Sequence, residues 1–142
     1  MKNIVINFYL LWGAWQDFRE KKISVTYLKV GVVLGLILLL YDFFNKQVNS
    51  KEMILSFLPG IIFICISKIT KEKIGIGDGL VFLLIGIFWG EKTWMLWQTS
   101  LVLSSLYSFI MIVAKKSKLE NQIAFIPFVW LGHFLLWSFY YD

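Results

Sequence analysis

The stretch Gly75-Ile-Gly-Asp-Gly-Leu-Val-Phe-Leu-Leu-Ile-Gly-Ile-Phe-Trp-Gly90 places one carboxylate, that of Asp78, at the mouth of an apolar run. A lone charge in or beside hydrocarbon is costly, and less so where it faces a cavity or a partner. Gly75, Gly77 and Gly79 surround this aspartate, and glycine allows close backbone approach and torsion angles that other residues avoid. The stretch therefore predicts an apolar helix that begins beside a functional carboxylate.

Composition extends this prediction to the whole chain. Of its 142 residues, 58% are hydrophobic and 16% are charged, and the mean hydropathy is +0.71. A soluble domain carries roughly a quarter of charged residues, so the chain is predicted to be an all-α, polytopic membrane protein. The apolar residues fall into six blocks, which predicts about six transmembrane helices in a single domain over residues 1–142: 4–15, 25–44, 53–69, 76–89, 93–114 and 123–141.

Two of these blocks, the first and the fourth, are short for a membrane span of roughly 20 residues. The first block ends close to Asp17, and the fourth begins beside Asp78. We therefore expect each of these helices to run about one turn further around a polar pocket.

The basic residues are distributed unevenly between the connections. Cytoplasmic connections of membrane proteins carry an excess of lysine and arginine. This bias predicts that both termini lie outside the cell membrane, and that the basic residues orient the chain and contact anionic lipid rather than nucleic acid. Ten basic residues accompany the first, third and fifth connections and four lie on the opposite side: Arg19, Lys21, Lys22, Lys29, Lys68, Lys71, Lys73, Lys115, Lys116 and Lys118 against Lys2, Lys46, Lys51 and Lys92.

This topology brings two aspartates to the cytoplasmic side. Asp78 begins the fourth block, and Asp17 follows the first. Two carboxyl groups at close range share a proton more readily than both ionise. The ionised member can take a proton from a water molecule that attacks an amide carbonyl, and the protonated member can donate to the carbonyl oxygen or to the leaving nitrogen. This is aspartyl protease chemistry, which requires no metal or cofactor.

The positions and chemistry of the two aspartates also allow a purely structural role for both. Aspartate is a good helix N-cap, so Asp78 could cap the fourth helix, and Asp17 could pair with Arg19 or a nearby lysine. Cys65 and His133 are each the only residue of their type, and a metal site needs more ligands than one of either. No metal and no cofactor are therefore expected.

Two motifs resemble those of a known family. Gly75-Ile-Gly-Asp78 is similar to the Gly-x-Gly-Asp motif of the type IV prepilin and preflagellin peptidases, which are intramembrane-type aspartyl proteases of the A24 type. The family's first aspartate typically occurs as Asp-x-Arg-x-x-x-Ile-Pro-Asn, and this chain has Asp17-Phe-Arg-Glu-Lys-Lys-Ile23 followed by Ser-Val. The separation of the aspartates, the six-span layout and a proline near the start of the last helix are similar too. The resemblance implies that Asp17 and Asp78 are catalytic, and that five further residues shape the site or bind substrate: Gly75, Gly77, Gly79, Arg19 and Pro127.

The resemblance also implies a substrate. It would be a prepilin-like precursor (a type IV pilin, Tad pilin or pseudopilin) with a short basic leader ahead of a hydrophobic helix. Cleavage is expected at the cytoplasmic face of the prokaryotic plasma membrane, in pilus assembly or protein secretion. Large members of the family add a cytoplasmic domain and methylate the new N-terminus, whereas this chain resembles the short members. We therefore expect peptidase activity without methyltransferase activity.

Departures from the family pattern leave an alternative open. Leu80 replaces a lysine that many members carry, and Ser24-Val25 replaces Pro-Asn, so the chain could be a catalytically inactive relative that acts as a membrane assembly factor. A presenilin-like protease is disfavoured, because those families pair Gly-x-Gly-Asp with Tyr-Asp. A channel is disfavoured as well, and the polar residues of the fifth block are expected to hydrogen-bond between helices: Gln98, Thr99, Ser104, Ser105 and Ser108. The sequence predicts no oligomeric state.

Overall fold

The computed structural model describes residues 2–45, 50–70, 75–114 and 123–140, and six helices lie in these ranges. They are α1 (Lys2–Glu20), α2 (Val25–Phe44), α3 (Ser50–Ile69), α4 (Ile76–Trp89), α5 (Lys92–Val113) and α6 (Ile126–Tyr140). No strand occurs in these ranges, so the predicted all-α class is confirmed. α2, most of α3 and α5 are long and apolar enough to cross a membrane, and α4 and α6 are shorter apolar helices.

The helix bounds follow the apolar blocks closely, with α1 as the main exception. α1 continues through the polar residues after the first block and ends at Glu20, so the expected extension is confirmed there. α4 keeps the predicted bounds and has only 14 residues, so the extra turn expected for it is wrong. The reason is glycine at both ends: Gly75 stands before the helix, and Gly90 ends it with a φ of 61°, a conformation that favours glycine.

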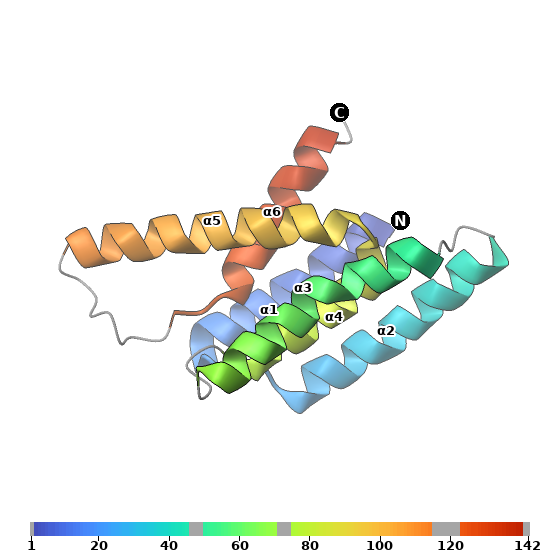
Figure 1. Ribbon diagram of the computed structural model, residues 1–142, viewed down its shortest axis with the longest axis horizontal. Helices are drawn as coiled ribbons and strands as arrows, with labels where there is room; N and C mark the ends of the chain where they lie inside the picture. Colours follow the sequence, from blue (N-terminus) through green and yellow to red (C-terminus); the bar gives the residue numbers. More distant parts are fainter. Residues whose placement is uncertain (1, 46–49, 71–74, 115–122, 141–142) are drawn as a thin grey trace.

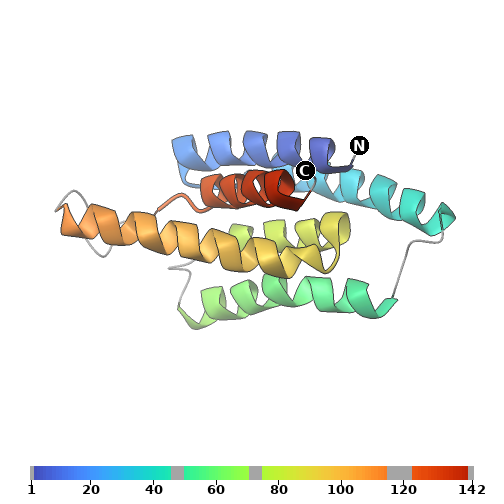
Figure 2. The same cartoon turned by 90° about the horizontal axis from the view of Figure 1, so that it is seen from above.

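The helix ends gather the two aspartates on one side of the molecule. The C-terminal ends of α1, α3 and α5 and the N-terminal ends of α4 and α6 lie on the left of Figure 1. Asp17 lies near the end of α1 and Asp78 in the first turn of α4, so we call this side the aspartate end. α5 runs past the ends of α1 and α3 on this side in both views (Figure 1 and Figure 2).

Only some of the basic residues that predict the membrane orientation lie among the described residues. Arg19, Lys21, Lys22, Lys29 and Lys68 belong to helices or connections at the aspartate end. Six other basic residues that were used for the orientation lie outside the described residues: Lys46, Lys71, Lys73, Lys115, Lys116 and Lys118. The orientation therefore stays a prediction.

α3 and α4 pack backbone against backbone, because glycine stands at the contact. A Cβ atom on Gly79 would lie 2.6 Å from Cγ1 of Ile64 and 3.1 Å from the carbonyl oxygen of Gly60. A Cβ atom on Gly60 would in turn lie 2.7 Å from the backbone nitrogen of Leu83. Gly79, predicted to shape the site, thus places α4 directly against α3.

α1 and α2 pack through two tyrosines, each of which lies over a glycine of the other helix. The hydroxyl of Tyr9 lies against Gly31, and that of Tyr27 lies against Gly13. The two rings stack with their centroids 4.3 Å apart and their planes 9° apart. Away from this contact most side chains of α2 are apolar and point outward, since its buried residues are Tyr27, Gly31 and Gly35. Such a surface suits contact with lipid.

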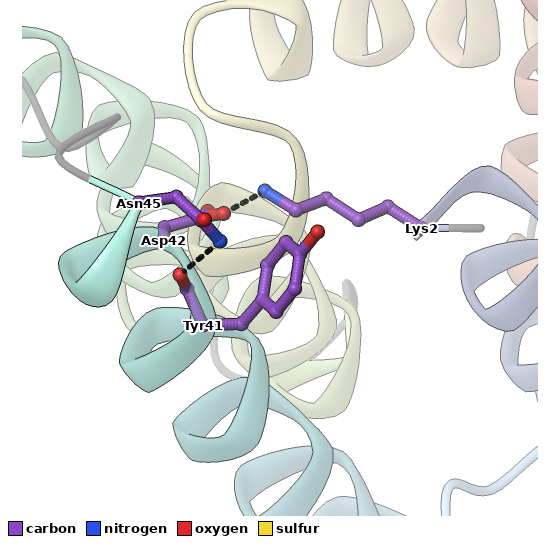
Figure 3. A network of polar contacts seen from close by, with 4 residues as sticks. All are labelled: Lys2, Tyr41, Asp42 and Asn45. Atoms are coloured by element: carbon purple, nitrogen blue, oxygen red, sulfur yellow. Dashed lines mark hydrogen bonds and ion pairs between the residues drawn. The ribbon is translucent and has the colours of Figure 1, made fainter.

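An ion pair joins α1 and α2 at the end opposite the aspartates. Figure 3 shows the ammonium group of Lys2 beside the carboxylate of Asp42. The same ammonium lies 5.9 Å from the centre of the Tyr41 ring, and the Asn45 side chain donates a hydrogen bond of 2.8 Å to the Tyr41 carbonyl oxygen. Asp42 is therefore a carboxylate with a charged partner, far along α2 from the site described below.

The hydroxyl groups of α5 bond within their own helix. Thr99 donates to the carbonyl oxygen of Met95 at 2.6 Å. Ser104, Ser105 and Ser108 bond in the same way to carbonyl groups three or four residues earlier. The expectation of bonds between helices is wrong for these four residues, because a serine or threonine in a helix can satisfy its hydroxyl on the preceding turn.

Candidate active site

Asp17 is buried at the aspartate end, with 5% of its surface exposed. Its Oδ2 atom accepts a hydrogen bond of 2.9 Å from the backbone N–H of Ile126, the first residue of α6. The first amides of a helix have no partner within it, so Asp17 supplies one from another helix. Pro127 follows without an N–H to satisfy, and the amides of Phe128 and Val129 donate to the Phe125 carbonyl. Pro127 thus belongs to the start of α6 that Asp17 holds.

Arg19 lies away from Asp17. Its side chain is exposed, and its guanidinium lies 5.5 Å from the centre of the Trp15 ring. Helix positions two apart do not face each other. The ion pair between Asp17 and Arg19 that the sequence left open is therefore not formed, and the guanidinium, predicted to shape the site, lies on the outer face of α1.

Asp78 occupies the first turn of α4 and is half-buried. The N-cap position belongs to Gly75, and no side chain caps the helix, so the capping role left open for Asp78 is wrong. Its backbone N–H donates to the Gly75 carbonyl oxygen at 3.2 Å. A carboxylate in the first turn is favoured by the partial positive charge of the helix N-terminus.

The glycines around Asp78 have different surroundings. A Cβ atom on Gly77 would lie 2.9 Å from Cδ1 of Ile23, so Gly77 lets the start of α4 lie against the connection that follows α1. A Cβ atom on Gly75 would have the Asp78 carboxylate as its nearest neighbour, at 3.5 Å. Gly77 therefore joins the two aspartate-bearing motifs, and Gly75 lies beside the Asp78 carboxyl group.

A cluster of phenylalanines links the start of α6, which Asp17 holds, with α4, which carries Asp78. Phe125 directly precedes α6, which Asp17 holds, and Phe82 lies one turn after Asp78. Their ring centroids are 6.1 Å apart, and both rings pack on Phe63 of α3, at 5.3 and 5.4 Å. The two carboxyl groups therefore lie at the same end of the bundle beside an apolar wall, an arrangement that acid–base hydrolysis can use.

A protein-family model matches almost the whole chain. The model of the type IV leader peptidase family matches residues 4–140, a range that includes both aspartates and parts of all six helices. The chain belongs to the type IV leader peptidase family. Membership supports a membrane peptidase, with a prepilin-like protein as the family's substrate. Neither the comparison with curated proteins nor that with solved structures gives a match.

In this family member, the departure from Pro-Asn gives a different helix cap. Ser24 is the N-cap of α2, and its Oγ accepts a hydrogen bond of 3.1 Å from the Tyr27 N–H. The N–H and hydroxyl of Ser24 donate to Oε1 of Gln16, at 3.3 and 3.1 Å. Gln16, the neighbour of Asp17, thus ties the end of α1 to the start of α2.

Ser24→Ala should lower the free energy of unfolding by about 1 kcal/mol, because it removes the cap and a hydrogen bond to Gln16. Thermal unfolding of the purified leader peptidase in detergent measures the change. Thr26→Ala, which alters an exposed residue of the same turn, is the matched control and should have a clearly smaller effect. Equal losses in the two variants would contradict the capping role.

Sequence reasoning missed the groups that hold Asp17. The Ile126 N–H is a backbone group 109 positions away, and no side-chain pattern marks it. Tyr27 and Gln16 were missed as well. One pattern points to the tyrosines, since both α1 and α2 contain Tyr-x-x-x-Gly, at Tyr9 to Gly13 and at Tyr27 to Gly31.

Proposed function

We propose that this member of the leader peptidase family is an aspartyl endopeptidase that removes the short basic leader of prepilin-like precursors. The observation that carries the proposal is the position of Asp17 and Asp78 at the same end of the bundle, where Gly77 of one motif packs against Ile23 of the other. The two come from segments that match the family's motifs, in a chain whose match covers residues 4–140.

The proposed reaction divides acid and base work between the two aspartates. The ionised carboxyl takes a proton from water as the water oxygen bonds to the scissile carbonyl carbon. The protonated carboxyl gives its proton to the leaving nitrogen as the C–N bond breaks, which restores the pair with one shared proton. The Ile126 N–H fixes one oxygen of Asp17 during this cycle, and the half-buried Asp78 lies beside Gly75, where an extended substrate backbone can approach closely.

We place the aspartate end at the cytoplasmic face of the prokaryotic plasma membrane. Described basic residues at that end outnumber acidic ones, with Arg19, Lys21 and Lys22 grouped after Asp17. The opposite end carries the Lys2–Asp42 pair instead. An excess of basic residues on one side supports a cytoplasmic position for it.

Co-expression with candidate precursors from the same genome tests the function. The wild-type protein should shorten a precursor, which a gel shift detects. Mass spectrometry should place the cleaved bond at the end of the basic leader and show an unmethylated new N-terminus. Asp78→Asn keeps the size of the side chain but removes the carboxylate chemistry, so it should leave the precursor uncut. Asp42→Asn, at the other end of the bundle, is the control and should cleave.

Two outcomes would contradict the proposal. Cleavage by Asp78→Asn at the wild-type rate would remove Asp78 from the reaction. A folded wild-type protein that cuts no precursor, yet is needed for pilus assembly, would favour the inactive assembly factor.

A further inference from the structure

The side chain of Tyr27 has no exposed surface, and its hydroxyl has no hydrogen-bond partner among the described residues. Buried polar side-chain atoms are nearly always bonded, so an orphan hydroxyl calls for an explanation. Its position is well determined by its neighbours. The ring stacks on Tyr9 and meets the edge of Trp12 at 5.3 Å, so the hydroxyl cannot swing to a distant acceptor without breaking this packing.

The tip of this ring points to the face of α1 that carries Asp17. The hydroxyl lies directly over Gly13, and Asp17 is four residues further along the same helix. Positions four apart are surface neighbours, about 5–6 Å between Cβ atoms. Because Gly13 has no side chain, it does not fill the space between the Tyr27 hydroxyl and Asp17.

The Asp17 carboxyl has room for a further donor. Its Oδ2 accepts from the Ile126 N–H, and the backbone of Phe125 also bonds to the carboxyl group. A carboxylate offers about four acceptor positions on its two oxygens, so two backbone donors do not fill it. A separation of one helical turn is a span that one water molecule can bridge, and a water bridge is nearly as favourable as a direct hydrogen bond.

We propose that Tyr27 is a positioning residue for Asp17. Its hydroxyl donates, through one bridging water, to the carboxyl oxygen that Ile126 does not engage. The carboxyl group is then held from two directions in the orientation that hydrolysis needs. The tyrosine keeps its proton throughout and does not contact the scissile bond. This role rests on the proposed function, since it presupposes that Asp17 takes part in cleavage.

Tyr27→Phe tests the role, because it keeps the ring stack and removes only the hydroxyl. Steady-state cleavage of the precursor by purified protein in detergent micelles should show kcat reduced about tenfold with KM unchanged, as loss of one hydrogen bond to a charged group predicts. The thermal midpoint should change little, because phenylalanine keeps the ring stack with Tyr9. Tyr9→Phe, which keeps the same stack and lacks the other hydroxyl, is the matched control and should retain kcat within about twofold.

Several outcomes would overturn the role of Tyr27. They are an unchanged kcat in Tyr27→Phe, a rise in KM alone, or an equal loss of kcat in Tyr9→Phe, which would indicate general loosening of the α1–α2 contact. Asp17→Asn in the same assay separates this inference from the proposed function. An inactive Asp17→Asn beside a fully active Tyr27→Phe rejects the role of Tyr27 alone, whereas an active Asp17→Asn rejects the aspartyl mechanism.

Discussion

Asp17→Asn should abolish leader cleavage and leave the helix bundle intact, whereas Asp17→Ala should damage both. The asparagine side chain keeps an oxygen that can accept from the Ile126 N–H, so the start of α6 stays held. It cannot exchange a proton with water, and acid–base catalysis contributes roughly 10²–10⁴-fold to a rate. Alanine in addition leaves the buried Ile126 N–H without a partner, which costs about 1–3 kcal/mol.

Cleavage rates and thermal unfolding of the same preparations distinguish these effects. Asp17→Asn should be inactive with a near wild-type midpoint, and Asp17→Ala should be inactive with a lower midpoint. Asp42→Asn provides the control, because that carboxylate pairs with Lys2 at the other end of the bundle. If both Asp17 variants unfolded early and both cleaved once stabilised by lipid, Asp17 would be a structural cap of α6 and nothing more.

Gly79→Ala should lower the free energy of unfolding by about 1–3 kcal/mol, the usual cost of overpacking. The added Cβ would meet Ile64 at 2.6 Å and the Gly60 carbonyl at 3.1 Å, and backbone atoms cannot move aside as a side-chain tip can. At an unobstructed position in a helix, Gly→Ala stabilises the protein by up to about 1 kcal/mol. A loss of stability in Gly79→Ala would therefore by itself indicate that the added Cβ atom clashes with α3. Activity should fall too, because α4 carries Asp78 and a displacement of 1 Å can cost about 10²-fold in rate.

Gly35→Ala is the matched control for this prediction. It lies in α2 facing α4, and a Cβ atom there would have only side-chain atoms near it, with Phe88 nearest at 3.3 Å. Thermal unfolding and cleavage should therefore change much less than in Gly79→Ala. A Gly79→Ala protein as stable as wild type would show that α3 and α4 separate readily, and that the contact does not fix Asp78.

Much of the helical fold could be predicted from the sequence, because hydrophobic blocks bounded by glycine or charge leave little choice of boundary. α2 and α4 have the predicted ends at Val25, Phe44, Ile76 and Trp89. The end of α1 was harder to place, because four of the five residues after Trp15 in this helix are polar or charged. A helix that packs against α6 can continue through such residues, and local hydropathy does not register that contact.

The two carboxylates of the candidate site could be predicted from the sequence, but the groups that hold them in place could not. Asp17 and Asp78 are visible as charges beside apolar blocks, and the alternation of spans puts them on one side. The Asp17–Ile126 bond and the Tyr27 contact with Gly13 join distant segments through a backbone amide and an absent side chain. Neither leaves a charge pattern in the sequence. Arg19 shows the converse, since its place in a motif suggested the site, while helix periodicity turns it outward.

The short length of α4 has a consequence for hydration. A helix of 14 residues rises about 21 Å, which is less than the roughly 30 Å of a bilayer's hydrocarbon core. If α4 crosses the membrane, one of its ends therefore lies within the hydrocarbon region, where polar groups need polar partners or water. A water-filled recess at the Gly75 end would bring water to Asp78, three residues later. In the proposed reaction this water is the reagent, so lengthening α4 at this end should lower the rate of cleavage.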